Sequence, residues 1–306
     1  MSRKSAVAPD PTAIGNVSSP PFARLPDPGS TFSARAVRLR QLAETSELSP
    51  YLQFLADLAQ AQHAIQADLP TADAPDGPTI ERARAFAMPL IDRARIEGDT
   101  VVLSTLFDRL FAAATPIEKP IAAAEALTRV RAADSERRGV MARDVFAHAL
   151  PADAIAEHIF IWAALQVHFA RLAAALDVKA LVPVADGICP ACGSLPVTSM
   201  VVGWPGSHGA RFCCCSLCGT LWHYVRIKCV LCGSTKGIGY QEIDGQGGAI
   251  KAETCDECQG WSKILYQERE PAADPIADDV ASLGLDLLMR QGPYRRGGFS
   301  PLLAGF

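Results

Sequence analysis

Eight of the ten cysteines stand in four C-x-x-C pairs, and this pattern constrains the fold more than any other feature of the chain. The pairs are Cys189/Cys192, Cys215/Cys218, Cys229/Cys232 and Cys255/Cys258. Twenty-two residues separate the first pair from the second, and the same number separates the third from the fourth. The second half therefore repeats the first after 40 positions, with CPACGS matching CVLCGS in this register.

C-x-x-C pairs of this kind are typical of metal sites. A tight turn directs both thiolates toward one ion, and two pairs complete a tetrahedral cage of four sulfur atoms. In three pairs a glycine follows the second cysteine, where the backbone needs a left-handed step, and these are Gly193, Gly219 and Gly233. Gln259 takes this place in the fourth pair. The eight paired cysteines are therefore predicted to be metal ligands.

The connections between the pairs decide which of them share an ion. Each 22-residue gap contains turn-forming residues near its middle, Gly203–Gly206 in one and Asp244–Gly248 in the other. We expect each gap to fold back as a hairpin. The connecting segment Thr220–Lys228 alternates like a strand, so the second and third pairs should lie about 30 Å apart. Two tandem sites are predicted, although a cross-braced arrangement of the first and third pairs stays open.

Tetrahedral sulfur sites accept either zinc or iron, and the spacing does not choose between them. A thiol–disulfide catalyst would place its C-x-x-C pair at the start of a helix, whereas these pairs lie among turns, so we do not expect an enzyme. The alternative function is a zinc-ribbon protein that acts in nucleic-acid or transcription-related binding. The segment 187–268 holds six Lys/Arg and six Asp/Glu, and the whole chain has a net charge of −4, which argues against nucleic acid as a partner.

Two further cysteines fall within the stretch RFCCCSLCGT. The 40-residue register selects Cys215 and Cys218 as ligands and leaves Cys213 and Cys214 outside the pairs. On a strand, Cys213 and Cys215 would face one side of the sheet and Cys214 the other. We expect Cys213 to lie near the first site without binding the ion.

The first 188 residues contain no cysteine, and their apolar residues recur at helical spacing. The strongest pattern lies in Ile155–Leu176. The helices expected before it are Ser33–Glu44, Ser49–Leu69, Ile80–Glu97, Val101–Ala114, Ile117–Ala133 and Arg137–Ala149. A last helix is expected to begin at Asp274-Pro275, because an acidic cap followed by proline is typical of a helix start.

These patterns predict an α+β protein: an all-helical N-terminal domain, two tandem rubredoxin-like or zinc-ribbon modules, and a C-terminal helix. The predicted divisions are a disordered tail (1–25), the helical domain (26–182), the modules (187–226 and 227–268) and the C-terminal helix (274–291). Residues 292–306 are expected to be loosely ordered. The first twenty residues lack an apolar leader, and no apolar run is long enough to span a bilayer. We therefore expect a cytoplasmic protein without direct membrane insertion.

Several stretches resemble the formate dehydrogenase accessory proteins of the FdhE family. Four of them surround the cysteine pairs: CPACGSLPV, LWHYVRIKC, IKAETCDEC and KILYQE. Two more lie in the helical part: FIWAALQVHFARLA and RLRQLAETSELSPYLQFLADLAQAQ. The resemblance extends over about Arg24 to Leu288, and its cysteine motifs are specific.

This resemblance implies a helical domain followed by two rubredoxin-like modules, each binding one iron ion through four cysteines, with zinc possible instead. In the family pattern only the eight paired cysteines are ligands, and Cys213 and Cys214 fall outside it. The resemblance also implies a non-catalytic cytoplasmic role in the maturation of active respiratory formate dehydrogenase. The implied partner is the catalytic subunit of that enzyme.

Overall fold

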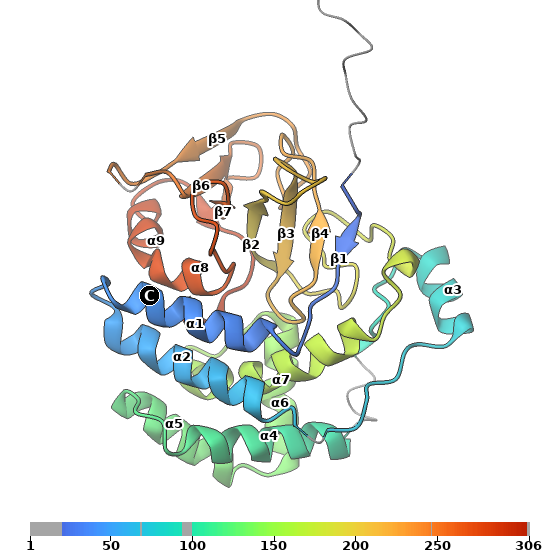
Figure 1. Ribbon diagram of the computed structural model, residues 1–306, viewed down its shortest axis with the longest axis vertical. Coiled ribbons are helices and arrows are strands. Elements are labelled where there is room, and N and C mark those ends of the chain that lie inside the picture. Colours follow the sequence, from blue (N-terminus) through green and yellow to red (C-terminus); the bar gives the residue numbers. More distant parts are fainter. Residues whose placement is uncertain (1–19, 68, 94–99, 246, 305–306) are drawn as a thin grey trace, which may run out of the picture.

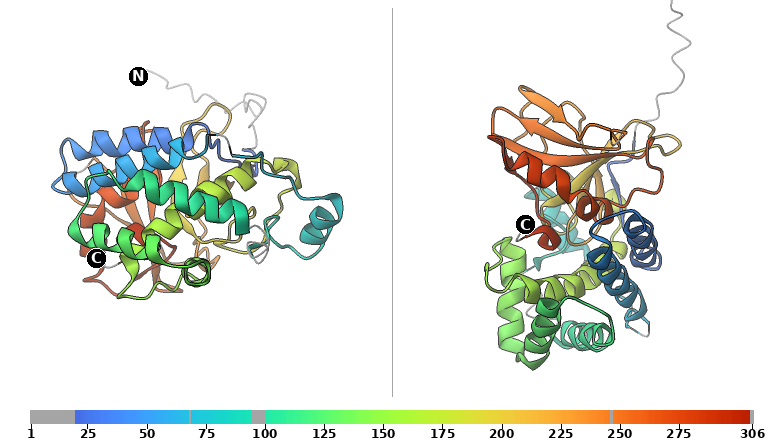
Figure 2. Two further views of the ribbon diagram at one scale, coloured as in Figure 1. Left: turned by 90° about the horizontal axis from the view of Figure 1, so that it is seen from below. Right: turned by 90° about the vertical axis from the view of Figure 1, so that its left-hand side faces the viewer.

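The structure is a computed structural model of the chain, and it describes residues 20–67, 69–93, 100–245 and 247–304. Helices form one layer and a single mixed sheet forms the other, as Figure 1 and the right-hand view of Figure 2 show. Ala23–Arg24 forms strand β1 of this sheet, so the expected disordered tail does not extend to residue 25. The rest of that prediction, residues 1–19, lies outside the described residues.

The helical layer confirms the predicted all-helical N-terminal region. Its helices are α1 (Thr31–Ala43), α2 (Ser49–Ala64), α3 (Gly77–Ala85), α4 (Thr100–Ala114), α5 (Ile121–Ala132), α6 (Ser135–Ala147) and α7 (Ile155–Ala174). Helix α7 packs against α2, α4, α5 and α6, because apolar side chains such as Leu165 and Phe169 occur on most of its faces. It is the central helix of the layer.

One predicted helix, Ile80–Glu97, differs from the structure. Helix α3 begins at Gly77, where the Asp76 side chain accepts a hydrogen bond from the Thr79 N–H, and it ends at Ala85. Ala87 has a left-handed backbone (φ 48°), which is incompatible with a continuing helix. The last part of the predicted range, residues 94–97, lies outside the described residues.

The two cysteine-bearing halves contribute three strands each to one sheet. The strands are β2 (Pro196–Val201), β3 (Arg211–Cys215), β4 (Leu221–His223), β5 (Ile238–Gln241), β6 (Ile250–Cys255) and β7 (Gly260–Tyr266). Their order is β1-β4-β3-β2-β7-β6-β5, and β8 (Arg295–Arg296) also pairs with β7. Pairing within each half is antiparallel, whereas β2 and β7 join the halves in parallel, from Ser199↔Ile264 to Val201↔Tyr266. The two halves therefore share a continuous sheet.

The strand predicted over Thr220–Lys228 is wrong beyond its first residues. Strand β4 ends at His223, and the chain then turns, with the Lys228 N–H donating to the Val225 carbonyl. Val225 is 51% exposed and Ile227 68% exposed. The alternating apolar residues Val225 and Ile227 therefore belong to a surface turn. Because the segment is not a straight strand, the second and third cysteine pairs need not lie 30 Å apart.

The expected C-terminal helix occurs as two short helices, α8 (Ala277–Ala281) and α9 (Leu283–Met289), which are separated at Ser282. The Asp274 carboxylate accepts hydrogen bonds from the N–H groups of Ile276 and Ala277, in agreement with its predicted role as a cap. Residues 305–306 lie outside the described residues, but the segment 292–304 is not loosely ordered as expected. It forms β8 and a 3-10 turn over Pro301–Leu303, whose three side chains are buried against the helical layer.

Buried ion pairs fasten the layers and the two halves together. Arg38 of α1 pairs with Asp278 of α8 at 2.6 Å, and Arg211 of β3 pairs with Glu253 of β6 at 2.8 Å. Lys263 of β7 pairs with Asp279 at 3.2 Å. Across the part of the chain that the structure describes, no helix combines the length and apolar character that crossing a membrane requires.

Candidate metal centre

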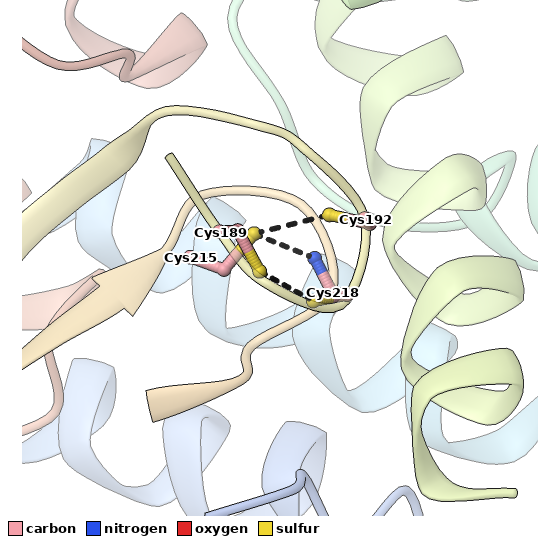
Figure 3. A group of neighbouring side chains, drawn as sticks. All are labelled: Cys189, Cys192, Cys215 and Cys218. Carbon is pink, nitrogen blue, oxygen red and sulfur yellow. Dashed lines mark hydrogen bonds between the residues drawn. The ribbon is translucent and has the colours of Figure 1, made fainter. Parts of the chain in front are cut away.

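The first cysteine cluster forms where two loops of the first half meet. Cys189 and Cys192 lie in the loop before β2, Cys215 ends β3, and Cys218 lies in the turn before β4. The four Sγ atoms lie within 4.8 Å of one another, and Figure 3 shows them converging on one point. The Sγ atoms of Cys189 and Cys218 are 3.7 Å apart, and those of Cys192 and Cys215 are 3.4 Å apart.

The second cluster repeats this arrangement with Cys229, Cys232, Cys255 and Cys258. Its Sγ separations are 3.9 Å between Cys229 and Cys258, and 3.8 Å between Cys232 and Cys255. A tetrahedron with metal–sulfur bonds of about 2.3 Å has an edge of about 3.8 Å. Both clusters therefore have the dimensions of a tetrahedral thiolate site, and all ten cysteines are free of disulfides.

The grouping of the sulfur atoms excludes the cross-braced arrangement. The first pair lies with the second and the third with the fourth, as the tandem prediction requires. This grouping follows from the hairpins β2–β3 and β5–β6, which bring the two ends of each 22-residue gap together. His208 and His223, which lie near the cysteines in sequence, belong to neither cluster of the described chain.

Each cysteine loop closes through a left-handed residue and through backbone donors. Gly193, Gly219 and Gly233 have φ values of 75°, 76° and 74°, and Gln259 takes the same region with φ 51°. The N–H groups of Leu217 and Cys218 both point at the Cys215 sulfur, at 3.4 Å. Such donors offset part of the negative charge that four thiolates concentrate around one ion.

The two clusters differ in exposure. All four cysteines of the first cluster are completely buried (0% exposed), and they belong to the main hydrophobic core of the molecule. In the second cluster, Cys229 and Cys255 are buried, whereas Cys232 and Cys258 are exposed. One cluster is therefore enclosed by protein, and the other has two of its cysteines at the surface.

The thiols within each cluster interact strongly. Burial raises the pKa of Cys189 and of Cys218 well above the usual value. Burial also opposes ionisation of Cys192, yet hydrogen bonds from neighbouring thiols and the Ser194 N–H hold its pKa well below that value. In the second cluster, burial again opposes ionisation, but the N–H groups of Cys258 and Glu257 lower the pKa of Cys255. Within each cluster, hydrogen bonds thus favour the thiolate form of one cysteine.

Cys213 and Cys214 lie outside both groups of four. Burial raises the pKa of Cys213 to about 12, with Arg211 and Glu253 as its charged neighbours. Burial also raises the pKa of Cys214 well above its usual value, and this side chain lies near Asp274 and Arg35. They are consecutive residues of β3, so they face opposite sides of the sheet, and Cys213 lies near Glu253 of the second half.

A polar group beside the second cluster was not predicted from the sequence. The Lys228 ammonium pairs with Asp186 at 2.7 Å, and the Tyr224 hydroxyl donates to the same carboxylate at 2.7 Å. The Cys229 carbonyl accepts a hydrogen bond from Tyr224 at 3.0 Å. Lys228 therefore has a carboxylate partner beside the second cluster. Asp186 lies far from Lys228 in the chain, so no local pattern signals this contact.

Comparisons with known proteins agree along the whole chain. The family descriptions "FdhE, N-terminal", "FdhE, central domain" and "FdhE, C-terminal domain" match residues 20–186, 188–226 and 227–303. Among curated relatives, the "Protein FdhE homolog" of Rhizobium meliloti is 48% identical and covers 99% of both chains. "Protein FdhE" of Escherichia coli O1:K1 / APEC is 36% identical and covers 89% of this chain and 87% of its own.

A solved structure has the same fold. The crystal structure of the FdhE protein from Pseudomonas aeruginosa superimposes with a TM-score of 0.81 and 33% sequence identity. The match covers 93% of this chain and 99% of that one. The two proteins therefore share their fold over nearly the whole chain.

Proposed function

The chain belongs to the FdhE family, and on this premise we propose that it is a non-catalytic accessory protein required for the maturation of active formate dehydrogenase. We propose that it acts in the cytoplasm by binding the catalytic subunit of respiratory formate dehydrogenase. The observation that carries this proposal is the pair of four-cysteine clusters within a chain that matches FdhE proteins over nearly its full length.

The eight clustered cysteines are the proposed ligands of two metal ions, and iron is the proposed metal. Both clusters fit a tetrahedral ion in sulfur separation and in donor type. Bound iron would supply a one-electron ferric/ferrous couple, whereas zinc has no redox chemistry. The chain's own contribution is to hold four thiolates around each ion and to present Cys232 and Cys258 at the surface.

A role without catalysis agrees with how the cysteines are used. All four C-x-x-C pairs lie in the clusters, and the two remaining thiols are buried with raised pKa values, which makes them poor nucleophiles. The two modules hold equal numbers of Lys/Arg and Asp/Glu, whereas a ribbon that binds nucleic acid should be basic, so nucleic acid is not a proposed partner.

The metal assignment is tested by anaerobic purification of the full chain, metal analysis and visible absorption. We expect two iron ions per chain and thiolate-to-iron absorption bands that bleach when a reductant is added. A colourless protein with two zinc ions, obtained from cells supplied with both metals, would contradict the iron assignment.

The client is tested in a strain that lacks the gene for this chain. We expect formate dehydrogenase activity to be lost during anaerobic respiration and to return with the intact gene. We also expect the tagged protein to co-purify with the catalytic subunit. Normal activity in the deletion strain would contradict the maturation role, and restored activity without co-purification would contradict direct binding of this subunit.

A further inference from the structure

A cavity of about 640 Å³ opens where the helical layer, the sheet and the C-terminal segment meet. Cavities that bind small molecules have volumes of roughly 300–1,000 Å³. Its wall includes His148 after α6, Trp261 of β7, Arg290 at the end of α9, and Arg296 of β8. Residues distant in sequence therefore line one cavity, and none of the clustered cysteines is part of its wall.

The cavity lies between the two cysteine clusters. The Tyr294 hydroxyl donates to the Asp256 carboxylate at 2.7 Å, and the Arg295 N–H donates to the Gln259 carbonyl at 2.8 Å. Asp256 and Gln259 belong to the cysteine loop of the second cluster. At the other side, the Phe299 N–H donates to the carbonyl of Pro196 at 3.0 Å, and Pro196 begins β2 directly after the loop that holds Cys192 of the first cluster.

The charge of the wall favours an anion. Three arginines line the cavity with a single carboxylate, that of Asp286. Arg296 is already paired with Asp279 and Asp286. Arg290 and Arg295 are exposed, and within the described parts of the chain neither has an ion pair. Two guanidinium groups are therefore available for a ligand, and their planar geometry suits a phosphate.

The remaining wall offers aromatic rings. The rings of His148 and Phe299 are 4.7 Å apart, and Trp261 and Tyr294 also face the cavity. The left-handed backbone of His148, with φ 55°, is the C-cap of helix α6, and the end of this helix therefore fixes the place of the ring in the wall.

We propose that this cavity binds a phosphate-bearing aromatic compound of nucleotide size. Arg290 and Arg295 would hold the phosphate groups, and the aromatic side chains would contact the ring system. This inference is independent of the client proposed above, since it rests on the cavity alone.

The test titrates the full-length, metal-loaded protein with ATP, adenosine and tripolyphosphate, using calorimetry. We expect ATP to bind at least about tenfold more tightly than adenosine or tripolyphosphate, because each half of the ligand contributes contacts. The double variant Arg290→Ala/Arg295→Ala should lose about tenfold or more in ATP affinity. Both side chains are exposed, so this variant should keep its fold and its metal content.

Two further variants control for general effects. Arg226→Ala removes an exposed arginine after β4, distant from the cavity along the sheet, and should leave ATP binding unchanged. His148→Asn removes the ring but tolerates the left-handed backbone, so it should weaken ATP binding while metal content stays constant. The proposal is overturned if ATP does not bind, if either half binds as tightly as ATP, or if the double arginine variant binds like the unmodified protein.

Discussion

The two cysteine clusters share their spacing and sulfur geometry, yet the protein surrounds them differently. In each cluster the four sulfur atoms lie within 4.8 Å of one another. Each cysteine of the second cluster follows its counterpart in the first by 40 positions. The first is buried throughout, whereas the second exposes Cys232 and Cys258. A repeat in sequence thus preserves the ligand cage, while the position of each half in the fold determines access to it.

The difference follows from the order of the strands. The first half lies inside the sheet, with β1 on one side and β7 on the other, and it packs on the helical layer. Gln166 of α7 donates to the Ser216 carbonyl at 2.9 Å, and the Ile91 N–H donates to the Ala191 carbonyl at 2.8 Å. The second half ends the sheet at β5, so part of its cluster meets solvent.

The largest contrast is expected between Cys192→Ser and Cys232→Ser. Both variants should lose one metal ion per chain. Structural zinc sites contribute about 10–16 kcal/mol to folding. Loss of the enclosed site in Cys192→Ser should therefore lower the free energy of unfolding by at least ~5 kcal/mol. The Tm should fall by about 10 °C or more. Because Cys232 is exposed, its variant should lower Tm by less than about 5 °C. Metal analysis and thermal unfolding by circular dichroism measure both effects. Equal losses of Tm would refute this division between the clusters.

The connection between the halves is tested next with Arg211→Met. This variant leaves Glu253 buried without its 2.8 Å partner, which should cost about 3–5 kcal/mol. The double variant Arg211→Met/Glu253→Leu removes both charges and should recover most of that loss. Urea unfolding measures the free energies. A single variant within about 1 kcal/mol of the unmodified protein would show that the pair does not join the halves.

Thiol labelling distinguishes exposed from buried cysteines by their reactivity and does not depend on a change in stability. After metal removal under reducing conditions, iodoacetamide at pH 8 should modify Cys232 and Cys258 before the other cysteines. Cys213 should react only after unfolding, because it is buried and its pKa is raised to about 12. Peptide mass spectrometry identifies the labelled positions. Early labelling of Cys189 or Cys192 would show that the first cluster is not enclosed.

The smallest effect on metal content is expected for Cys213→Ser and Cys214→Ser. Both variants should keep two ions per chain, whereas Cys215→Ser, the matched control, should keep one. Burying a hydroxyl in place of a thiol should cost about 1–3 kcal/mol. A loss of metal in either of the first two variants would assign that cysteine to a cluster.

The grouping of the eight cysteines into two clusters could be predicted from the sequence because its determinants are local. C-x-x-C spacing and turn-forming residues between the pairs fix which sulfur atoms meet. Gln259 shows that even the pair without a following glycine adopts the same left-handed closure. The helical layer was predictable for the same reason, since the apolar spacing of α7 lies within one segment.

The features that were missed depend on contacts between distant segments. The parallel pairing of β2 with β7 joins the two halves, and no pattern within either strand signals it. Burial of Pro301–Leu303 likewise depends on the helical layer, where the Tyr51 hydroxyl donates to the Leu302 carbonyl. The strand predicted over Thr220–Lys228 relied on alternation that includes Val225 and Ile227, which are exposed. Alternation alone does not distinguish a surface turn from a half-buried strand.

Metal release from the anaerobically purified full chain tests the contrast between the clusters most directly. The protein is mixed with a chelating dye, and the free ion is followed with time. We predict two ions per chain, one released at least about tenfold faster than the other, because the enclosed site must open before the dye can reach it. The fast phase should be missing in Cys232→Ser. Release of both ions in one phase, or a fast phase that persists in this variant, would contradict the account.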